Sequence, residues 1–295
     1  MKIIRKKDQF DEVGRWSEDK LSLLKKYLEA YTKIMKNQRW CKGYYYIDAF
    51  AGTGKPKARD EKRFIDGSPC CALSIKNPFT AYFFIEKEKW RIKKLESIKR
   101  RFKDLEIIIK NDDCNEVLTK LIPQFPYSSF KRVLVFLDPF GMNISWEIIE
   151  QAAKIKTIEI FLNMPIMAIN RACLLNNPSK LTQKHIERMN RFWGNNDWQN
   201  IMYIDASTLF GPIKIKDYID GKKLSEYFIK RLKSVFEYVS LPLIMRNSKN
   251  TPLYCLIYAG HNDKAKKIVE DIFKHFEKLK ALKLLEHNLI LKVPK

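Results

Sequence analysis

Four acidic residues stand where an apolar run of the sequence gives way to a turn. They are Asp48, Glu86, Asp113 and Asp138. Such apolar runs are typical of buried parallel strands, which end together at the carboxyl edge of a sheet, where ligands bind in open α/β folds. We therefore expect the four carboxylates to gather at one site. There they can accept hydrogen bonds from a cofactor and from a second, planar ligand, a pairing that indicates group transfer.

The first of these turns, Asp48-Ala-Phe-Ala-Gly-Thr-Gly54, holds two glycines that allow a ligand to approach the backbone closely. A dinucleotide fingerprint needs a third glycine where Lys57 stands, and a P-loop needs Ser or Thr where Pro56 stands. The remaining candidate is S-adenosylmethionine (SAM), whose site has no pyrophosphate to neutralise. The predicted cofactor contacts in this turn are Asp48, Phe50, Ala51, Gly52 and Gly54. The alternative is an ordinary glycine turn.

Two further acids fit the same cofactor. Glu86 ends Phe83-Phe-Ile-Glu86 and is placed to accept both hydroxyls of a ribose. Asp113, with the neighbouring Cys114, is predicted to contact the adenine, through the exocyclic amine and a ring nitrogen. Asp112 is the less favoured choice for this role. For each acid taken singly, the structural alternative is a helix N-cap or a solvated turn.

The turn Asp138-Pro139-Phe140-Gly141 suits a planar acceptor with an exocyclic amine. Such an amine is a poor nucleophile, because its lone pair conjugates with the ring. The Asp138 carboxylate and the Pro139 carbonyl can bind both amine hydrogens and so favour a pyramidal nitrogen, while Phe140 stacks on the base. We predict that residues 138–141 are catalytic, with no metal. The alternative is that Asp138 caps backbone N–H groups.

A second polar turn follows the next apolar run, at Asn163-Met-Pro165. Asn163 and Arg171 are predicted to line the acceptor pocket, where Arg171 could hold a phosphate or stack on a base. A buried Asn that satisfies backbone groups is an equally good explanation for Asn163.

The chain is basic: 56 Lys and Arg stand against 34 Asp and Glu, which gives a net charge of +22 over 295 residues. The charge indicates a polyanionic partner, most simply nucleic acid, although a genome that encodes basic proteins throughout would give the same balance. Six cysteines without a Cys-x-x-Cys pair argue against a zinc site or a disulfide framework. No apolar run approaches the roughly 18 residues of a membrane helix, so we expect a cytoplasmic protein without a membrane partner.

Apolar runs alternate with helical segments through the first half of the chain. Strands are expected at 44–49, 81–86, 106–109, 133–137 and 158–162, and helices at 17–36, 67–75, 88–102, 115–122 and 146–154. Ser17 and Ser68 are the expected N-caps. This alternation predicts a Rossmann-like, doubly wound α/β fold with a mostly parallel sheet of about seven strands.

The pattern changes after residue 162. Helices are expected at 180–193 and 222–238, around a loop-rich aromatic piece, and strands at 241–246 and 253–259 form a hairpin before a helix at 263–281. We predict one domain, 1–295, with an N-terminal helical extension at 1–43 and a mainly helical insertion at 163–240 that could serve as a substrate lobe.

Several of these segments together resemble the three-Cys-motif partner family. The resemblance rests on 46–54, Asp66-Gly-Ser-Pro69, Phe84-Ile-Glu86, Asp113-Cys-Asn115, Leu137-Asp-Pro-Phe-Gly141, Asn170-Arg171, Pro252-Leu-Tyr254, and Trp16, Lys20 and Leu21. It implies a Rossmann-like methyltransferase fold and a partnership with a neighbouring three-cysteine protein that looks like a radical-SAM enzyme. It does not imply a substrate.

The turn at 138–141 is similar to that of tRNA guanine-N2 dimethyltransferases. It stands where adenine amino-methyltransferases carry (Asp/Asn)-Pro-Pro-(Tyr/Phe), but Phe140 and Gly141 depart from that pattern. The sequence therefore favours a SAM-dependent methyltransferase acting on guanine N2, or adenine N6, of RNA rather than DNA. The alternative is a non-catalytic nucleic-acid-binding scaffold that serves the three-cysteine protein.

Overall fold

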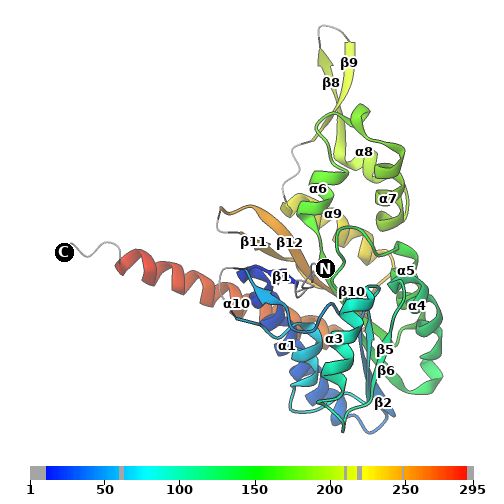
Figure 1. The fold of residues 1–295 in the computed structure, drawn as a ribbon. Coiled ribbons are helices and arrows are strands. Elements are labelled where there is room, and N and C mark those ends of the chain that lie inside the picture. Colours follow the sequence, from blue (N-terminus) through cyan, green and yellow to red (C-terminus); the bar gives the residue numbers. More distant parts are fainter. Residues whose placement is uncertain (1–10, 60–62, 209–210, 218–220, 248, 291–295) are drawn as a thin grey trace, which may run out of the picture.

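A mixed sheet of eight strands forms the centre of the fold in the computed structural model, which describes residues 11–59, 63–208, 211–217, 221–247 and 249–290 (Figure 1). The strand order is β10-β12-β7-β6-β2-β4-β5, and β11 also pairs with β12. The bounds are β2 Gly43–Asp48, β4 Ala81–Ile85, β5 Ile107–Lys110, β6 Lys131–Leu137, β7 Ile158–Met164, β10 Tyr238–Val239, β11 Leu243–Arg246 and β12 Pro252–Gly260.

Strands β5, β4, β2, β6 and β7 are parallel, and β12 is antiparallel to β7. From β2 the chain first builds the sheet toward β5 and then returns to build β6 and β7 on the other side. This reversal places a topological switch point between β2 and β6, at the carboxyl ends of the parallel strands. The predicted Rossmann-like, doubly wound α/β sheet is confirmed, including the hairpin of β11 and β12.

Helices cover both faces of the sheet. Their bounds are α1 Arg15–Lys36, α2 Ser68–Leu73, α3 Lys89–Lys99, α4 Cys114–Leu121, α5 Trp146–Ile155, α6 Ile166–Ala172, α7 Gln183–Trp193, α8 Trp198–Met202, α9 Gly221–Lys233 and α10 Asp263–Ile290, with short 3₁₀ turns at Ile122–Gln124, Tyr127–Ser129 and Pro178–Lys180. None of the helices within these described ranges has a stretch long and apolar enough to cross a bilayer.

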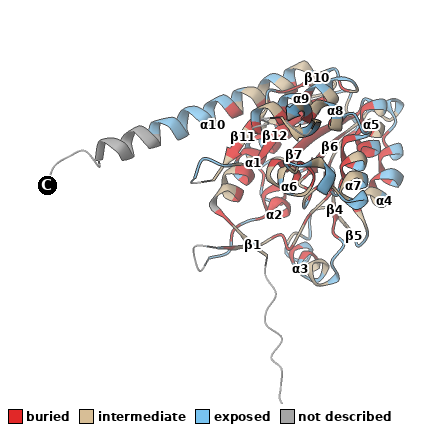
Figure 2. Cartoon of the chain, turned by 90° about the horizontal axis from the view of Figure 1, so that it is seen from above, coloured by how far each residue is buried: buried red, intermediate tan, exposed pale blue. Residues whose placement is uncertain are grey.

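Alternate residues of each strand enter two different cores, as the pleat of a strand requires. Tyr46 of β2 packs in the core under α1, α2, α3 and α10, whereas its neighbour Ile47 packs in the core under α4, α5 and α9. Figure 2 shows the buried residues concentrated on the sheet and on the inner sides of the helices, with the far part of α10 extending beyond them. Because both faces are covered, the central strands are mostly apolar and do not alternate between apolar and polar residues.

Both predicted serine caps are wrong. The N-cap of α1 is Gly14 and that of α2 is Gly67, and neither helix has a side-chain cap hydrogen bond. Ser17 and Ser68 are buried within the first turns instead. Gly67 is required by packing, since a Cβ there would lie 2.9 Å from the carbonyl oxygen of Gly54.

The insertion at 163–240 holds more strand than predicted. Besides α6 to α9 it contains an antiparallel hairpin of β8 Tyr203–Thr208 and β9 Gly211–Lys216, which projects from the end of the molecule where α7 and α8 lie (Figure 1). The alternation of apolar and polar residues in Tyr203-Ile-Asp-Ala-Ser-Thr208 is weak, because a strand of an isolated hairpin buries few side chains. A short parallel pair, β1 Glu12–Val13 with β3 Lys57–Ala58, was not predicted either.

Candidate cofactor and acceptor site

A cavity of about 390 Å³ opens at the carboxyl edge of the sheet, beside the switch point. It is called the carboxyl-edge cavity below. Five predicted site residues line it: Phe50, Glu86, Asp113, Cys114 and Phe140. They come from the ends of β2, β4 and β6 and from the segment after β5. The cavity is thus lined by two of the predicted acids, Glu86 and Asp113, and by residues from the turns of the other two, Asp48 and Asp138. The remaining lining residues are Ala49, Ile85, Lys87, Glu88, Arg91, Asp112, Asn143 and Arg191.

The glycine turn after β2 borders this cavity. Gly52 and Gly54 have φ values of 61° and 71°, in the left-handed region that favours glycine. A Cβ on Gly54 would also lie 2.4 Å from the Cδ1 of Ile98 on α3. The turn therefore needs both glycines for its own shape, and the predicted contacts Ala51, Gly52 and Gly54 flank the cavity without lining it.

Glu86 is buried and already accepts hydrogen bonds from the chain. The Gly52 N–H donates to its Oε2 at 3.0 Å and the Glu88 N–H donates to its Oε1 at 2.8 Å. The Arg91 Nη1 lies 3.6 Å from Oε2. A carboxylate offers about four lone-pair sites, so acceptor capacity for a further hydroxyl remains. Glu86 thus ties the glycine turn to the end of β4.

Asp113 is the N-cap of α4, which is the alternative structural role that the sequence allowed for this acid. The Asn115 N–H donates to Asp113 Oδ1 at 3.0 Å, and Lys87 lies 3.4 Å from Oδ2. Although partial burial opposes it, the hydrogen bonds from Asn115 hold the pKa of Asp113 below its usual value. Asp113 and Cys114 nevertheless line the cavity, so capping and ligand contact are compatible here.

Asp48 lies under the glycine turn, with its side chain fully buried. The Phe50 N–H donates to Oδ1 at 3.2 Å, whereas Oδ2 has no hydrogen-bond partner within the described part of the chain. Burial raises the pKa of Asp48 to about 7. The buried Thr53 hydroxyl, in the same turn, also lacks a partner among the described residues. Neither Asp48 nor Thr53 is among the residues that line the carboxyl-edge cavity.

Asp138 is engaged on both oxygens. Lys20 of α1 forms an ion pair with Oδ2, and the Asn163 side-chain amide donates to Oδ1 at 2.6 Å. Lys20 is itself buried, so the pair links α1, β6 and β7 across the carboxyl edge. Asn163 is therefore a partner of Asp138 and lies beside the predicted acceptor turn. Its Oδ1 has no partner in the described chain.

Phe140 is the exposed residue of the Asp-Pro-Phe-Gly turn. Phe140 is 65% exposed and lies under the Arg91 guanidinium, 5.4 Å from its ring centroid. Gly141 has a φ of 67°, which lets the chain turn sharply after it. Phe140 lines the same cavity as Glu86 and Asp113, so its ring borders the predicted cofactor site as well as the predicted acceptor site. Pro139, which precedes Phe140, is buried.

Arg171 is not brought to the cavity. It lies exposed in the last turn of α6 and is not among the residues that line the carboxyl-edge cavity. The reason is the length of α6, which carries Arg171 two turns away from the end of β7. Asn163 does not line this cavity either, so the shared acceptor pocket of Asn163 and Arg171 stays a prediction.

Sequence reasoning missed two basic residues at this site. Lys20 falls at helical spacing with Leu24, Tyr27 and Tyr31, so a charge on an apolar helix face was the available sign of a buried ion pair. Arg91 forms an ion pair with Asp11 at 2.8 Å and approaches Glu86. Its position within a run of charged residues on α3 instead indicates a solvent-exposed side chain.

No protein-family model matches the chain, and no curated protein matches it. Among solved structures, protein LPL1258 from Legionella pneumophila is 13% identical, with a TM-score of 0.50 over 87% of this chain and 92% of that one. The N-terminal domain of EvdMO1 with SAH bound is 9% identical, with a TM-score of 0.40 over 81% of each chain. An rRNA methylase from Streptococcus thermophilus is 8% identical, with a TM-score of 0.39 over 81% of this chain and 95% of that one. At these identities the likeness concerns the fold alone.

Proposed function

We propose that this protein is a SAM-dependent methyltransferase that acts on an exocyclic amine of a nucleic-acid base. The observation that carries the proposal is the carboxyl-edge cavity, where Glu86, Asp113 and Phe140 meet beside the glycine turn. The cavity lies at the switch point of a doubly wound sheet, which is where such folds bind nucleotide-like ligands.

Each cofactor residue has a role that its environment allows. Glu86 binds the ribose hydroxyls with its remaining lone pairs, and Asp113 accepts from the adenine amine beside Cys114. Asp48, buried beneath the glycine turn, supports the cofactor side of the site by accepting from the Phe50 N–H. When bound, SAM supplies a methyl group on a sulfonium, an electrophile that needs neither a metal nor a covalent intermediate. Phe50 and Phe140 provide apolar walls.

The acceptor amine is held by the turn after β6. Asp138 and the Pro139 carbonyl accept from its two hydrogens, which frees the nitrogen lone pair to attack the methyl carbon. The new N–C bond forms as the S–C bond breaks, and the displaced proton leaves to water. Lys20 and Asn163 fix the Asp138 carboxylate in place, so the site is organised before the substrate arrives. Guanine N2 and adenine N6 are both candidates, with guanine favoured by the residues at 140 and 141.

Nucleic acid as the substrate rests on charge and on the insertion at 163–240. The net charge of +22 favours a polyanion. The insertion rises from the carboxyl end of the sheet, where α7 places Arg191 in the wall of the cavity (Figure 1). The insertion can thus serve as a substrate lobe, with RNA favoured over DNA. The resemblance to the three-Cys-motif partner family adds a neighbouring three-cysteine protein as the proposed partner.

Two measurements test this function. Titration calorimetry with S-adenosylhomocysteine should show binding at one site, and transfer of a labelled methyl group from SAM should label total RNA. Parallel reactions with DNA and with free nucleosides identify the substrate class. No binding of S-adenosylhomocysteine by cofactor-free protein would end the proposal.

One observation favours a second function. Both Asp138 oxygens are engaged by Lys20 and Asn163, as a purely structural aspartate would be. In that case the protein binds nucleic acid and presents it to the three-cysteine partner without catalysis. Bound RNA that acquires no label from SAM, with or without the partner, supports this alternative, whereas label on the RNA excludes it.

A further inference from the structure

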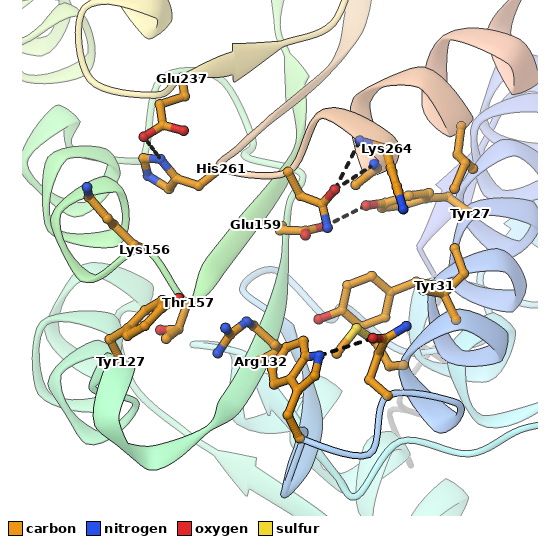
Figure 3. Close-up of a pocket in the computed structure, with 17 residues that line it drawn as sticks. Tyr27, Tyr31, Tyr127, Arg132, Lys156, Thr157, Glu159, Glu237, His261 and Lys264 are labelled. Atoms are coloured by element: carbon orange, nitrogen blue, oxygen red, sulfur yellow. Dashed lines mark hydrogen bonds and ion pairs between the residues drawn. The ribbon is translucent and has the colours of Figure 1, made fainter.

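A second and larger cavity, of about 690 Å³, lies at the opposite edge of the sheet. We call it the amino-edge cavity, because Arg132 and Glu159 in its wall stand at the starts of β6 and β7. Tyr27 and Tyr31 of α1 line one side, and Lys264 at the start of α10 lines another (Figure 3). The function proposed above uses none of these residues.

Glu159 provides a buried acceptor in this cavity. Its side chain is 9% exposed, and the Tyr27 hydroxyl donates to its Oε2 at 2.7 Å. The Tyr258 hydroxyl is a second donor to this carboxylate, which retains further lone pairs after two such bonds. Burial raises the pKa of Glu159 to about 7, against the opposing effects of the two tyrosine hydroxyls and of the Arg132 charge. A ligand that donates hydrogen bonds can use the remaining lone pairs.

Tyr31 adds an unsatisfied hydroxyl. The residue is 5% exposed, and its hydroxyl has no hydrogen-bond partner among the described residues. Figure 3 shows this hydroxyl directed into the cavity, on the side of Arg132. A buried polar group without a partner is unfavourable, so a ligand group that reached this hydroxyl would stabilise the complex.

Arg132 supplies donors and a stacked arrangement of planar groups. Its guanidinium lies 4.3 Å from the ring centroid of Trp40 and 5.2 Å from that of Tyr127. Both aromatic residues are exposed, at 43% and 62%. Arg132 and Glu159 line one cavity, yet no ion pair joins them among the described residues. The cavity therefore presents a negative acceptor, a positive donor and aromatic faces separately.

The ligand that satisfies all three is planar and carries donors on one edge and acceptors on the other. Guanine has adjacent N1–H and N2–H donors that suit a carboxylate, and O6 and N7 acceptors that suit an arginine. Adenine and cytosine would instead turn a ring-nitrogen acceptor toward the carboxylate beside their single amine. Lys156 and Lys264, both exposed in the cavity wall, are available to a phosphate.

We propose that the amino-edge cavity binds a guanine base, with Glu159 on its N1–H and N2–H edge and Arg132 on its O6 and N7 edge. The base comes either from a free guanine nucleotide or from a guanosine within RNA. This site stands apart from methyl transfer, because it lies at the other end of the parallel strands. It holds whether or not the carboxyl-edge cavity binds SAM.

Titration calorimetry with GMP and AMP on the full chain tests the assignment. We expect GMP to bind at least about tenfold more tightly than AMP, which is about 1.4 kcal/mol. Glu159→Gln should remove that preference, because an amide presents a donor to one of the guanine donors. The matched control is Glu237→Gln, a glutamate of the same cavity that is 56% exposed on its side chain and should leave the preference within about twofold. Circular dichroism confirms that both variants fold.

A short oligonucleotide with one unpaired guanosine separates the two sources. Equal affinities for GMP and the oligonucleotide indicate a free nucleotide, and tighter binding of the oligonucleotide, lost when its guanosine is replaced by adenosine, indicates RNA. Either result supports the guanine site. Equal binding of GMP and AMP, no binding of either probe at millimolar concentration, or full GMP preference in a folded Glu159→Gln variant would overturn it.

Discussion

Helix α1 contributes to both edges of the sheet, but it treats the carboxylates there in opposite ways. At the carboxyl edge its Lys20 forms a buried ion pair with Asp138, and Asn163 completes that carboxylate's partners. At the amino edge the same helix offers Glu159 only the neutral hydroxyl of Tyr27, and leaves the Tyr31 hydroxyl without a partner in the described chain. Asp138 is satisfied by a cation and an amide of the chain, whereas Glu159 has no ion pair and Tyr31 has no hydrogen-bond partner in the described chain.

The difference indicates two kinds of site. A carboxylate fixed by a permanent cation and an amide is rigid and keeps its orientation, which suits a group that must position a reacting amine. A buried carboxylate without a cation has a raised pKa and an unmet demand for donors, which suits a group that recognises a ligand by filling that demand. Pre-arranged partners thus favour chemistry, and missing partners favour binding.

The strongest test of this comparison is Asp138→Asn. If the Asp138 carboxylate positions the amine, the substitution should lower methyl transfer by about 100-fold or more, because an amide cannot accept from both the amine and Lys20. Binding of S-adenosylhomocysteine should stay within about threefold. The control is Asp104→Asn, which changes an exposed surface residue. Unchanged transfer in Asp138→Asn would assign the aspartate a structural role.

The second test uses the pH dependence of stability. The pKa of Glu159 is about 7 in the folded chain against 4.5 for an ordinary glutamate, so the folded state binds more protons between these values. Its contribution to the free energy of unfolding therefore falls as pH rises from about 4.5 to 7, by about 3 kcal/mol in total. Glu159→Gln removes this titration, so the stability of the wild type relative to the variant should fall over that range. Urea unfolding at several pH values measures it, and a constant difference would contradict the raised pKa.

The third test addresses the cofactor side of the carboxyl edge. Glu86→Gln should weaken binding of S-adenosylhomocysteine by about tenfold, since a charge-assisted hydrogen bond contributes about 1.5–3 kcal/mol and part of it is retained by the amide. Glu96→Gln serves as the control, because Glu96 lies on α3 and does not line the cavity. Equal affinities in all three proteins would mean that Glu86 only holds the Gly52 turn.

The sequence predicted the sheet well because its central strands are buried on both faces. Runs such as 133–137 can be recognised without knowing their neighbours, and an acid at the end of such a run must reach the carboxyl edge. Glu86 and Asp113 lie at that edge for this reason. Arg171 lies beyond the sheet, where the course of α6 decides its position, so the end of a strand does not predict where it lies.

The amino-edge cavity could not be predicted in the same way. Glu159 lies within the apolar run of β7, where one polar residue gives no sign of what it faces. The cavity wall also includes residues 27, 31, 132 and 264, which only the packing of α1 and α10 against the sheet brings together. Lys20 is intermediate, since its place on an apolar helix face predicts burial but does not name Asp138 as its partner.

The smallest expected effect concerns the substrate lobe. If the β8–β9 hairpin tracks a nucleic-acid backbone, then Lys214→Ala should weaken RNA binding slightly and lower the slope of log affinity against log salt by about one. Lys214 is exposed on β9, and the matched control is Lys274→Ala, an exposed lysine on α10 near the other edge of the fold. A phosphate contact changes the salt slope, whereas general attraction by the net charge changes little when one of many lysines is removed. Equal salt slopes for the two variants would indicate that RNA does not contact the hairpin at Lys214. A lower salt slope for Lys274→Ala alone would indicate that RNA contacts α10.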